Sequence, residues 1–298
     1  MNFKSGIVSI IGRPNVGKST LLNAVLGEKI VITSDKPQTT RNRALGVKHT
    51  ERGQIVFFDT PGIHDQRGLL NEYMVKVALK TFKEVDLILY MVEAGRGIGK
   101  GDRFVIEKME RVSTPVILCI NKVDLVKRDS VLPLITAYTG LFPFKEVIPI
   151  SALNNEGVET LISLLLDALP EGPRYFPDDT VTDMPERFIA AEIIREKVFR
   201  ALQQEVPYSV AVLVDSFKEA PERKLLSIAA SIYVERESQK GIIIGKGGKM
   251  LKGIGSRARR DMERLFGTRV YLELFVTVKK NWTKDGRRLK EFGYDLPQ

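Results

Sequence analysis

Short apolar runs alternate with longer amphipathic segments over residues 1–170. The runs have the length and β-branched content of strands, and the segments between them show the helical repeat of apolar positions. The predicted strands are 6–11, 44–49, 55–59, 87–93, 116–121 and 147–150. The predicted helices are 19–26, 70–83, 101–110, 130–139 and 158–169. This alternation predicts an α/β fold with a mostly parallel sheet, in which ligands bind at the carboxyl ends of the strands.

The pattern changes across residues 170–185, PEGPRYFPDDTVTDMP, which are rich in Pro and Asp and show no sustained period. We therefore predict a linker at 173–185, between a first domain at 1–172 and a second at 186–298. The second domain is expected to form an α-β-β-α-α-β unit. Its predicted elements are a helix at 187–202, strands at 208–217 and 227–237, a helix, glycine-rich loop and second helix over 241–266, and a strand at 270–279.

Residues 12–19, GRPNVGKS, match the phosphate-loop pattern GxxxxGK[ST] and lie between a predicted strand and a predicted helix. Such a loop turns backbone N–H groups toward phosphate oxygens, while Lys18 reaches the β- and γ-phosphates and the Ser19 hydroxyl binds magnesium. The alternative to a phosphate-binding loop is a glycine-rich turn that only connects the strand to the helix. The nucleotide-binding residues predicted here are Gly12, Arg13, Pro14, Asn15, Val16, Gly17, Lys18, Ser19 and Thr20.

The strand at 55–59 ends in Asp59, and Thr60, Pro61 and Gly62 follow it; all four are predicted to bind the nucleotide. This order places the Asp59 carboxylate beside the phosphate loop, able to hold the magnesium shell through water, and leaves the Gly62 N–H for a γ-phosphate. A switch also needs a hydroxyl that joins the magnesium only when the γ-phosphate is present. Thr40 is the first choice for it and Thr39 the second. The predicted metal ligands are Ser19, Thr40 and Asp59.

Residues 121–124, NKVD, follow another buried strand and indicate which base is bound. A carboxylate at Asp124 accepts both the ring N–H and the exocyclic amine of guanine, whereas adenine would leave it unpaired. A backbone N–H from 151–153 would then reach the guanine carbonyl. The predicted ligands are GTP and GDP with Mg²⁺, and the predicted base-binding residues are Asn121, Lys122, Asp124, Ser151, Ala152 and Leu153.

A second motif, GxxG, lies in residues 241–249, GIIIGKGGK, between two predicted helices. The KH module uses such a loop to hold about four nucleotides against its backbone. Residues 240–290 carry 15 Lys or Arg against 4 Asp or Glu, and the whole chain has a net charge of +9, which favours a polyanionic partner. Trp282 and Phe275 could both stack on bases, although for Phe275, which lies within a predicted strand, a place in the core is expected first. The predicted RNA-binding residues are Gly241, Ile242, Ile244, Gly245, Lys246, Gly247, Gly248, Lys249, Arg257, Lys280 and Arg287.

The motifs GRPNVGKS, QTTR, DTPG, NKVD and SAL together resemble those of the Era and EngA group of bacterial GTPases. A single P-loop GTPase domain followed by an α+β domain of type II KH order resembles the Era family, over essentially the whole chain. The resemblance implies slow GTP hydrolysis with magnesium, binding near the 3′ end of the small-subunit ribosomal RNA, and a role in assembly and maturation of the 30S subunit. It also implies a peripheral association with the inner membrane.

Ile63 follows Gly62 at the position where Ras-like GTPases carry a water-orienting Gln. Its side chain cannot position the attacking water. The resemblance to GTPases with an apolar residue here suggests that Asn15 helps to hold a potassium ion near the phosphates; alternatively, Asn15 only caps the loop. The predicted catalytic residues are Lys18, Thr40, Gly62 and Asn15.

Other function classes stay open to different degrees. A small-molecule kinase is disfavoured by NKVD, while an RNA-binding adaptor or a peripheral membrane GTPase that uses GTP mainly as a conformational ligand remains an alternative. The single cysteine, Cys119, excludes an intramolecular disulfide. No run approaches the roughly 18 apolar residues of a membrane span. We expect a cytoplasmic monomer, with any membrane contact peripheral at the inner membrane.

Overall fold

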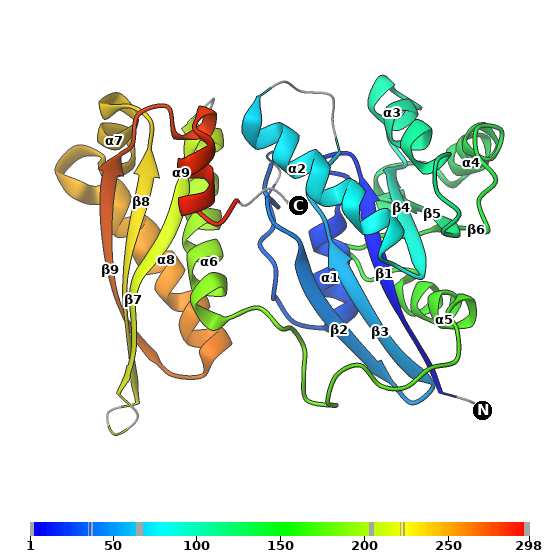
Figure 1. Cartoon of the computed structure of the whole chain (residues 1–298), viewed down its shortest axis with the longest axis horizontal. Helices are drawn as coiled ribbons and strands as arrows, with labels where there is room; N and C mark the ends of the chain where they lie inside the picture. The colour runs from blue at the N-terminus through cyan, green and yellow to red at the C-terminus, as the bar shows by residue number, and fades with distance from the viewer. Residues whose placement is uncertain are drawn as a thin grey trace.

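The computed structural model describes residues 3–34, 36, 38–63, 68–202, 206–220, 222 and 224–294, which form two α/β units side by side (Figure 1). Each unit is a β-sheet together with the helices that pack on it, and we call the two units the first and the second layer. The first layer is a six-stranded sheet of order β2-β3-β1-β4-β5-β6, parallel except for the antiparallel pair β2 and β3. Its strands are β1 (Lys4–Gly12), β2 (Ala44–Thr50), β3 (Gly53–Asp59), β4 (Leu87–Glu93), β5 (Val116–Asn121) and β6 (Glu146–Pro149). Its helices are α1 (Lys18–Leu26), α2 (Leu69–Lys80), α3 (Lys100–Met109), α4 (Val131–Thr139) and α5 (Val158–Ala168).

The central strands of this sheet are apolar on both faces because helices cover both faces. Ile10 on β1 belongs to the buried cluster that includes residues of α1 and α5. Its neighbour Ile11 belongs to the cluster on the opposite face, with residues of α2 and α3. Burial of one such side chain contributes about 1.5–3 kcal/mol relative to exposure, so the two faces together fix the strand register.

The second layer is a three-stranded sheet of order β7-β8-β9, with β7 and β8 antiparallel and β8 and β9 parallel. Alternate residues of β8 are buried, because helices pack on one face of the sheet. The elements are α6 (Glu186–Ala201), β7 (Ala211–Ala220), β8 (Leu225–Val234), α7 (Glu237–Ile244), α8 (Lys249–Phe266), β9 (Arg269–Val278) and α9 (Gly286–Glu291).

The segment between the two layers runs along the first sheet. The Val47 N–H donates to the Val181 carbonyl at 2.8 Å, and Thr182 Oγ1 donates to the Leu45 carbonyl at 2.6 Å. The N–H groups of residues 175 and 176 both donate to Gln54 Oε1. The predicted linker is therefore held against β2 and β3. The domain limits stay a prediction.

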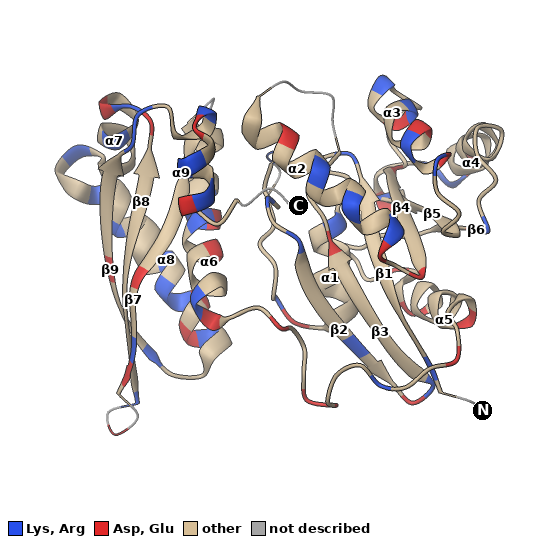
Figure 2. Ribbon diagram, in the orientation of Figure 1, with Lys and Arg blue, Asp and Glu red and all other residues tan. Residues whose placement is uncertain are grey.

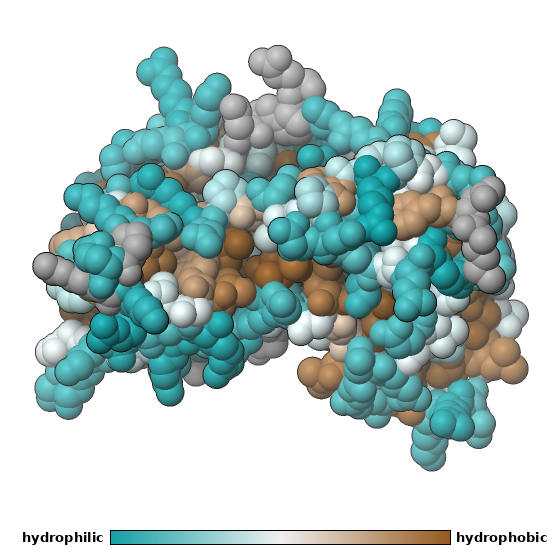
Figure 3. Space-filling view, turned by 90° about the horizontal axis from the view of Figure 1, so that it is seen from below, coloured by the Kyte–Doolittle hydropathy of each residue, from teal (hydrophilic) through white to brown (hydrophobic). Residues whose placement is uncertain are grey.

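The end of the described chain packs between the two layers. Trp282, which the sequence suggested as a base-stacking residue, is fully buried and donates from Nε1 to the Ser209 carbonyl at 2.9 Å. It shares a hydrophobic cluster with Tyr73 of α2 and with Tyr294. The expectation for Phe275 was also wrong, since its side chain is 54% exposed on the outer face of β9. Hydrophobic side chains also gather between the two layers in the view from below (Figure 3).

Among the residues that the structure describes, no helix combines the length and the apolar character that crossing a membrane requires.

Candidate functional site

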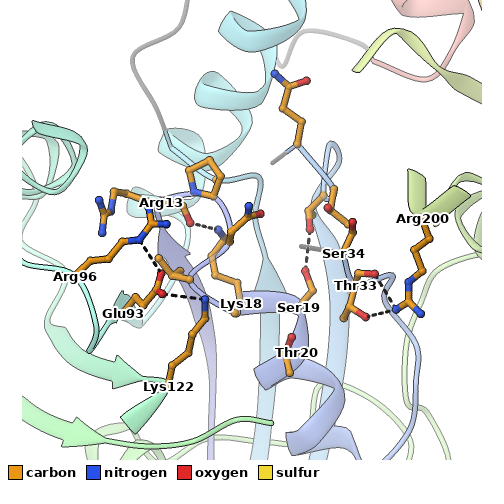
Figure 4. Close-up of a pocket in the computed structure, with 18 residues that line it drawn as sticks. Arg13, Lys18, Ser19, Thr20, Thr33, Ser34, Glu93, Arg96, Lys122 and Arg200 are labelled. Atoms are coloured by element: carbon orange, nitrogen blue, oxygen red, sulfur yellow. Dashed lines mark hydrogen bonds and ion pairs between the residues drawn. The ribbon is translucent and has the colours of Figure 1, made fainter. Parts of the chain in front are cut away.

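A cavity of about 850 Å³ opens where β1, β3, β4 and β5 end (Figure 4). This is the edge of the sheet at which the sequence predicted a nucleotide site. The phosphate loop forms one wall, and a residue of α6 in the second layer contributes to another. The lining residues are Arg13, Pro14, Asn15, Val16, Gly17, Lys18, Ser19, Thr20, Thr33, Ser34, Gln38, Thr39, Thr40, Gly62, Glu93, Arg96, Lys122 and Arg200.

The phosphate loop has a backbone that only glycine allows at two positions. Gly12 and Gly17 have φ values of 150° and 104°, and a Cβ on Gly12 would lie 2.3 Å from the Met91 carbonyl oxygen. Lys18 Nζ donates to the Arg13 carbonyl at 2.9 Å, so the ammonium lies over the loop. Burial lowers the pKa of Lys18 to about 8, although the nearby Asp59 charge acts in the opposite direction.

Arg13 is held in place by a carboxylate that the sequence analysis did not single out. Arg13 Nε lies 2.9 Å from Asp102 Oδ1, and Asp102, on α3, is fully buried. Asp102 also accepts a hydrogen bond of 3.2 Å from the Tyr90 hydroxyl and one of 2.8 Å from the Gly99 N–H. The only sequence signal for this role was an acidic residue in the first turn of a predicted helix.

The three predicted metal ligands come together at the base of the cavity. Ser19 Oγ donates to Asp59 Oδ2 at 2.6 Å and lies 2.9 Å from Thr40 Oγ1, which is 3.3 Å from the same carboxylate oxygen. Burial raises the pKa of Asp59, while the Lys18 charge and the hydrogen bonds from Ser19 and Thr40 oppose that shift. Asp59 Oδ1 is buried and has no hydrogen-bond partner among the described residues. Two hydroxyls and a carboxylate with an unsatisfied oxygen suit a hard, oxygen-binding cation such as Mg²⁺.

The segment after β3 places Gly62 against the phosphate loop and turns Ile63 away from it. A Cβ on Gly62 would lie 2.6 Å from the Pro14 nitrogen, so only glycine fits. The Ile63 N–H donates to the Gly12 carbonyl at 3.0 Å, and the Ile63 side chain is fully buried in the cluster that contains Phe82. Ile63 therefore does not reach a nucleophilic water in the cavity.

The base-reading loops are joined to the phosphate loop by Asn121, which is 2% exposed. Its Nδ2 donates to the Val16 carbonyl at 2.8 Å, and its Oδ1 accepts from the Ala152 N–H at 2.9 Å. Asp124 lies beyond it on a single 3₁₀ turn, Val123–Leu125, with its side chain exposed. Roles of 151–153 toward guanine stay predictions, because the N–H of Ser151 and that of Ala152 both have partners within the protein.

Some predicted nucleotide-binding residues do not line this cavity. Thr60 is buried and donates from Oγ1 to the Ile10 carbonyl at 2.8 Å, so its side chain supports β1. The others outside the lining are Gly12, Asp59, Pro61, Asn121, Asp124, Ser151, Ala152 and Leu153.

The described part of residues 29–41, which carries Thr40, lies against α6 of the second layer. Lys29 Nζ lies 2.7 Å from Glu196 Oε2 and 3.1 Å from Asp261 Oδ2 on α8. Arg200 Nη2 pairs with Glu196 Oε1 at 2.8 Å and donates to the Thr33 carbonyl at 3.1 Å. Burial alone would raise the pKa of Glu196, but hydrogen bonds from Lys197 and Lys29 outweigh it and hold that pKa below its ordinary value of 4.5. No pattern in the sequence indicated this ion-pair cluster, because its members are far apart in the chain.

Contacts with α6 continue along this segment. Lys36 Nζ donates to the carbonyls of Phe199 and Leu202. Arg195, which is 1% exposed, donates to the Thr39 carbonyl. Thr39 Oγ1, the second choice for the metal, donates to the Lys36 carbonyl at 2.7 Å. Thr40 is therefore the hydroxyl that faces Ser19 and Asp59.

The second motif forms an exposed loop between α7 and α8. Gly245, Gly247 and Gly248 have φ values of 69°, 59° and 74°, and a Cβ on Gly247 or Gly248 would meet nothing within 4 Å. This open glycine surface allows a nucleic-acid backbone to approach. Lys246 and Lys249 are exposed beside it, and Lys and Arg residues are frequent along α8 (Figure 2).

A groove of about 420 Å³ continues from the loop between α8 and β9. Tyr271 on its wall is 55% exposed, and Phe275 is exposed on the same face of the strand. Aromatic side chains on such a surface can stack on bases. Of the residues that line this groove, the predicted RNA contacts include only Gly248. The other lining residues lie on α8 and β9: Leu251, Lys252, Gly255, Ser256, Arg259, Val270, Tyr271, Leu272 and Leu274.

Three of the predicted RNA contacts lie neither in the glycine-rich segment 241–249 nor in the lining of this groove. Arg257 is exposed on α8 but does not line it. Lys280 follows β9, and its carbonyl accepts from Arg288 on α9 at 2.8 Å. Figure 1 shows α9 on the β7 side of the sheet, whereas the glycine loop lies beyond β9, so Arg287 is not brought to the loop. Their RNA contacts stay predictions.

Comparisons with known proteins define the class. Residues 7–122 match the family model described as 50S ribosome-binding GTPase, and residues 205–283 match that of the KH domain. The protein is a GTPase that carries a KH module. Its first sheet carries the phosphate loop, the NKVD loop and the triad of Ser19, Thr40 and Asp59, and its second carries the open GxxG loop. We call the described residues from 186 onward, which include the matched segment, the KH module.

The relatives give the particular family. The chain is 61% identical over 292 residues to GTPase Era of Geobacter metallireducens and 58% identical over 293 residues to GTPase Era of Geotalea uraniireducens, covering 98% of each chain. Among solved structures it resembles a variant of Aquifex aeolicus Era bound to GDP·AlF₄⁻, with a TM-score of 0.95, and Era in complex with MgGDPNP and nucleotides 1506–1542 of 16S ribosomal RNA, with a TM-score of 0.96. Both matches have 43% identity and cover 99% of this chain and 100% of the other. The chain belongs to the Era family of GTPases. The predicted family and fold class are thereby confirmed.

Proposed function

We propose that this GTPase binds and hydrolyses GTP with Mg²⁺ and binds the small-subunit ribosomal RNA near its 3′ end through the KH module, in assembly and maturation of the 30S subunit. The observation that carries the proposal is the similarity over the whole chain to an Era structure that holds both MgGDPNP and 16S ribosomal RNA. The open GxxG loop and its groove supply the matching surface in this protein.

The roles of the nucleotide-site residues follow from their positions. We assign Lys18 to the β- and γ-phosphates, the Gly62 N–H to the γ-phosphate, and Ser19 and Thr40 to the metal, with Asp59 acting through water. A bound Mg²⁺ would neutralise charge on the phosphates. Because Ile63 is buried, another group must hold the attacking water, and an ion near Asn15 would supply positive charge beside the phosphates.

Similarity to an Era protein bound to GDP·AlF₄⁻ supports hydrolysis over a purely conformational use of GTP. Multiple-turnover release of phosphate from GTP would exclude the adaptor alternative. A cytoplasmic monomer, with peripheral contact to the inner membrane, stays a prediction.

The test is binding of a labelled single-stranded RNA from the 3′ end of the small-subunit ribosomal RNA. It is measured at fixed salt with a non-hydrolysable GTP analogue, with GDP and without nucleotide. Tighter binding with the analogue supports a GTP-controlled interaction with ribosomal RNA. Equal binding in all three conditions contradicts nucleotide control, and absent binding contradicts the choice of RNA.

A further inference from the structure

Arg41 lies directly after the predicted magnesium ligand Thr40, yet its side chain is buried in the KH module. It is 1% exposed. Its Nη1 donates to the Val210 carbonyl at 2.7 Å and its Nη2 to the Tyr208 carbonyl at 2.9 Å. Weaker contacts at 3.4 and 3.3 Å join it to the Pro207 carbonyl and the Tyr294 hydroxyl.

Three aromatic rings complete this environment. The guanidinium carbon lies 5.6 Å from the ring centroid of Phe199 and 5.8 Å from those of Trp282 and Tyr294. We call these rings, the three carbonyls and the Tyr294 hydroxyl the Arg41 socket. No salt bridge to Arg41 occurs among the described residues. A planar guanidinium can donate to several carbonyls in its plane while its faces lie against aromatic rings, and a compact ammonium cannot make both sets of contacts at once.

The socket fixes the chain on one side of Thr40, and Arg195 fixes it on the other. Arg195 donates to the Thr39 carbonyl and is itself held by Glu192 through a 2.7 Å bond from Nε. Between these two attachments, Thr40 Oγ1 lies 2.9 Å from Ser19 Oγ. The KH module thus holds the backbone on both sides of the hydroxyl that points to the metal site.

We propose that Arg41 is a positioning residue through which the KH module holds Thr40 in its magnesium-binding position. Docking of the KH module and binding of the γ-phosphate then favour one and the same placement of residues 39–41. By linkage, each stabilises the other by the same factor. The proposal rests on the proposed function in one respect, the assignment of Thr40 to magnesium.

The chain offers a matched control for Arg41 two residues away. Arg43 is 42% exposed, lies 3.3 Å from Glu84 and has its guanidinium carbon 4.0 Å from the centre of the Phe58 ring. All of these contacts are within the GTPase domain. Arg43→Ala therefore removes an arginine of the same segment without touching the KH module.

The experiment measures the affinities of fluorescent GDP and of a fluorescent non-hydrolysable GTP analogue, with and without Mg²⁺. Arg41→Ala is expected to leave GDP affinity nearly unchanged and to reduce the preference for the analogue by a factor of roughly 5 to 150, the usual range of coupling between sites. Arg41→Lys is expected to lose much of the same preference, because a compact ammonium cannot replace the planar set of donors that reaches the carbonyls and the Tyr294 hydroxyl together. Thr40→Ala should lose it as well, and Arg43→Ala should keep it.

Two outcomes separate the inference from the function on which it rests. If Thr40→Ala loses the preference and Arg41→Ala keeps it, the positioning role is refuted and the metal assignment stands. If neither variant loses it, the assignment of Thr40 fails. Tyr294→Ala, which removes one ring and the hydroxyl of the socket near the end of the chain, gives a second test should Arg41→Ala fail to fold. An unchanged analogue preference in that variant contradicts the proposal.

A second readout concerns RNA. In Arg41→Ala, the KH module should bind RNA with the same affinity in the presence of GDP and of the GTP analogue, because the linkage is cut. A purely structural role for Arg41 would weaken RNA binding by the same factor with GDP and with the analogue, so the ratio of the two affinities would stay as it is in the unmodified protein. That result would overturn the proposal.

Discussion

The side-chain amide of Asn121 donates a hydrogen bond of 2.8 Å to the carbonyl oxygen of Val16. The other end of the same side chain accepts from the Ala152 N–H. One buried side chain therefore connects the loop that follows β5 with the phosphate loop and with the loop that follows β6. The base site and the phosphate site are held at a fixed distance by this connection.

Replacement of Asn121 by Ala is expected to weaken GTP and GDP alike. Each buried group left without a partner costs about 1–3 kcal/mol, so we expect a loss of affinity of at least about tenfold. Equilibrium binding of fluorescent GTP and GDP analogues measures it. Asn154→Ala is the control, since Asn154 is an exposed asparagine of the loop after β6. A loss confined to one of the two nucleotides would contradict this account.

Replacement of Asp124 by Asn should change the base that the protein prefers. An amide cannot accept two N–H donors as the carboxylate does, but it can donate to the second carbonyl of xanthine. We expect GTP affinity to fall by up to a factor on the order of 10⁴ and xanthosine triphosphate to be favoured. Competition between the two triphosphates gives the ratio. Asp129→Asn, an exposed acid a short distance along the chain, should bind as the unmodified protein does; an unchanged guanine preference in Asp124→Asn would refute the assignment.

Replacement of Gly247 by Asp should impair RNA binding and spare nucleotide binding. The change puts a negative charge where the phosphate backbone is expected, so we anticipate a loss of about tenfold or more, or about 1.4 kcal/mol. Gly267→Asp is a matched control, because Gly267 also has a left-handed φ, 66° against 59°, and also has open space around its Cβ position. Equal RNA affinity in the two variants would count against the KH assignment.

The ion pairs of Lys29 should stabilise the protein at neutral pH and lose their effect in acid. The pKa of Glu196 lies below 4.5 and that of Asp261 below 3.8. A depressed carboxylate pKa contributes stability above the pKa of the unfolded chain, and this contribution is lost as the pH falls through the folded pKa. Lys29→Met should therefore lower the free energy of unfolding by a constant amount down to about pH 4.5, and by less below it.

The size of this effect is on the order of 1 kcal/mol, because the Lys29 side chain is 41% exposed and solvent screens the pairs. Urea unfolding measures the change in the free energy of unfolding. The signal is the fluorescence of Trp282, the single tryptophan, which is buried in the cluster between the two modules. Lys127→Met, a change at an exposed lysine of the GTPase domain, should show no such pH dependence. A difference for Lys29→Met that grows in acid would contradict the sign.

Hydrolysis should be faster in potassium than in sodium if an ion near Asn15 supplies positive charge to the reaction. Asn15 has a φ of 66° and lines the nucleotide cavity. We expect Asn15→Ala to remove the potassium effect on phosphate release while GDP still binds. Rates that are the same in both salts would leave Asn15 with a role only in the shape of the loop.

The fold of the first sheet could be predicted closely from sequence because most of its strands are short apolar runs bounded by polar residues. The predicted strand at 55–59 lies within β3 (Gly53–Asp59), and the one at 116–121 coincides with β5 (Val116–Asn121). The triad of Ser19, Thr40 and Asp59 was predictable for a related reason. Ser19 and Asp59 belong to motifs at the ends of β1 and β3, and Thr40 lies in the polar segment between α1 and β2.

What the sequence did not reveal are contacts between residues far apart in the chain. No local pattern distinguishes Arg41, which enters the KH module, from Arg43, which stays at the surface. Trp282 was placed wrongly because its neighbours are basic, whereas its burial depends on α2. For Phe275 the alternation of side chains along β9 would have given the right prediction. Val270 and Val276 face the core, so Phe275, an odd number of positions from each of them, faces outward.

Because α6 covers one side of the described part of residues 29–41, a cellular partner meets that segment with the KH module already in place. A regulatory protein that recognises the GTP form would therefore read a composite epitope drawn from both modules.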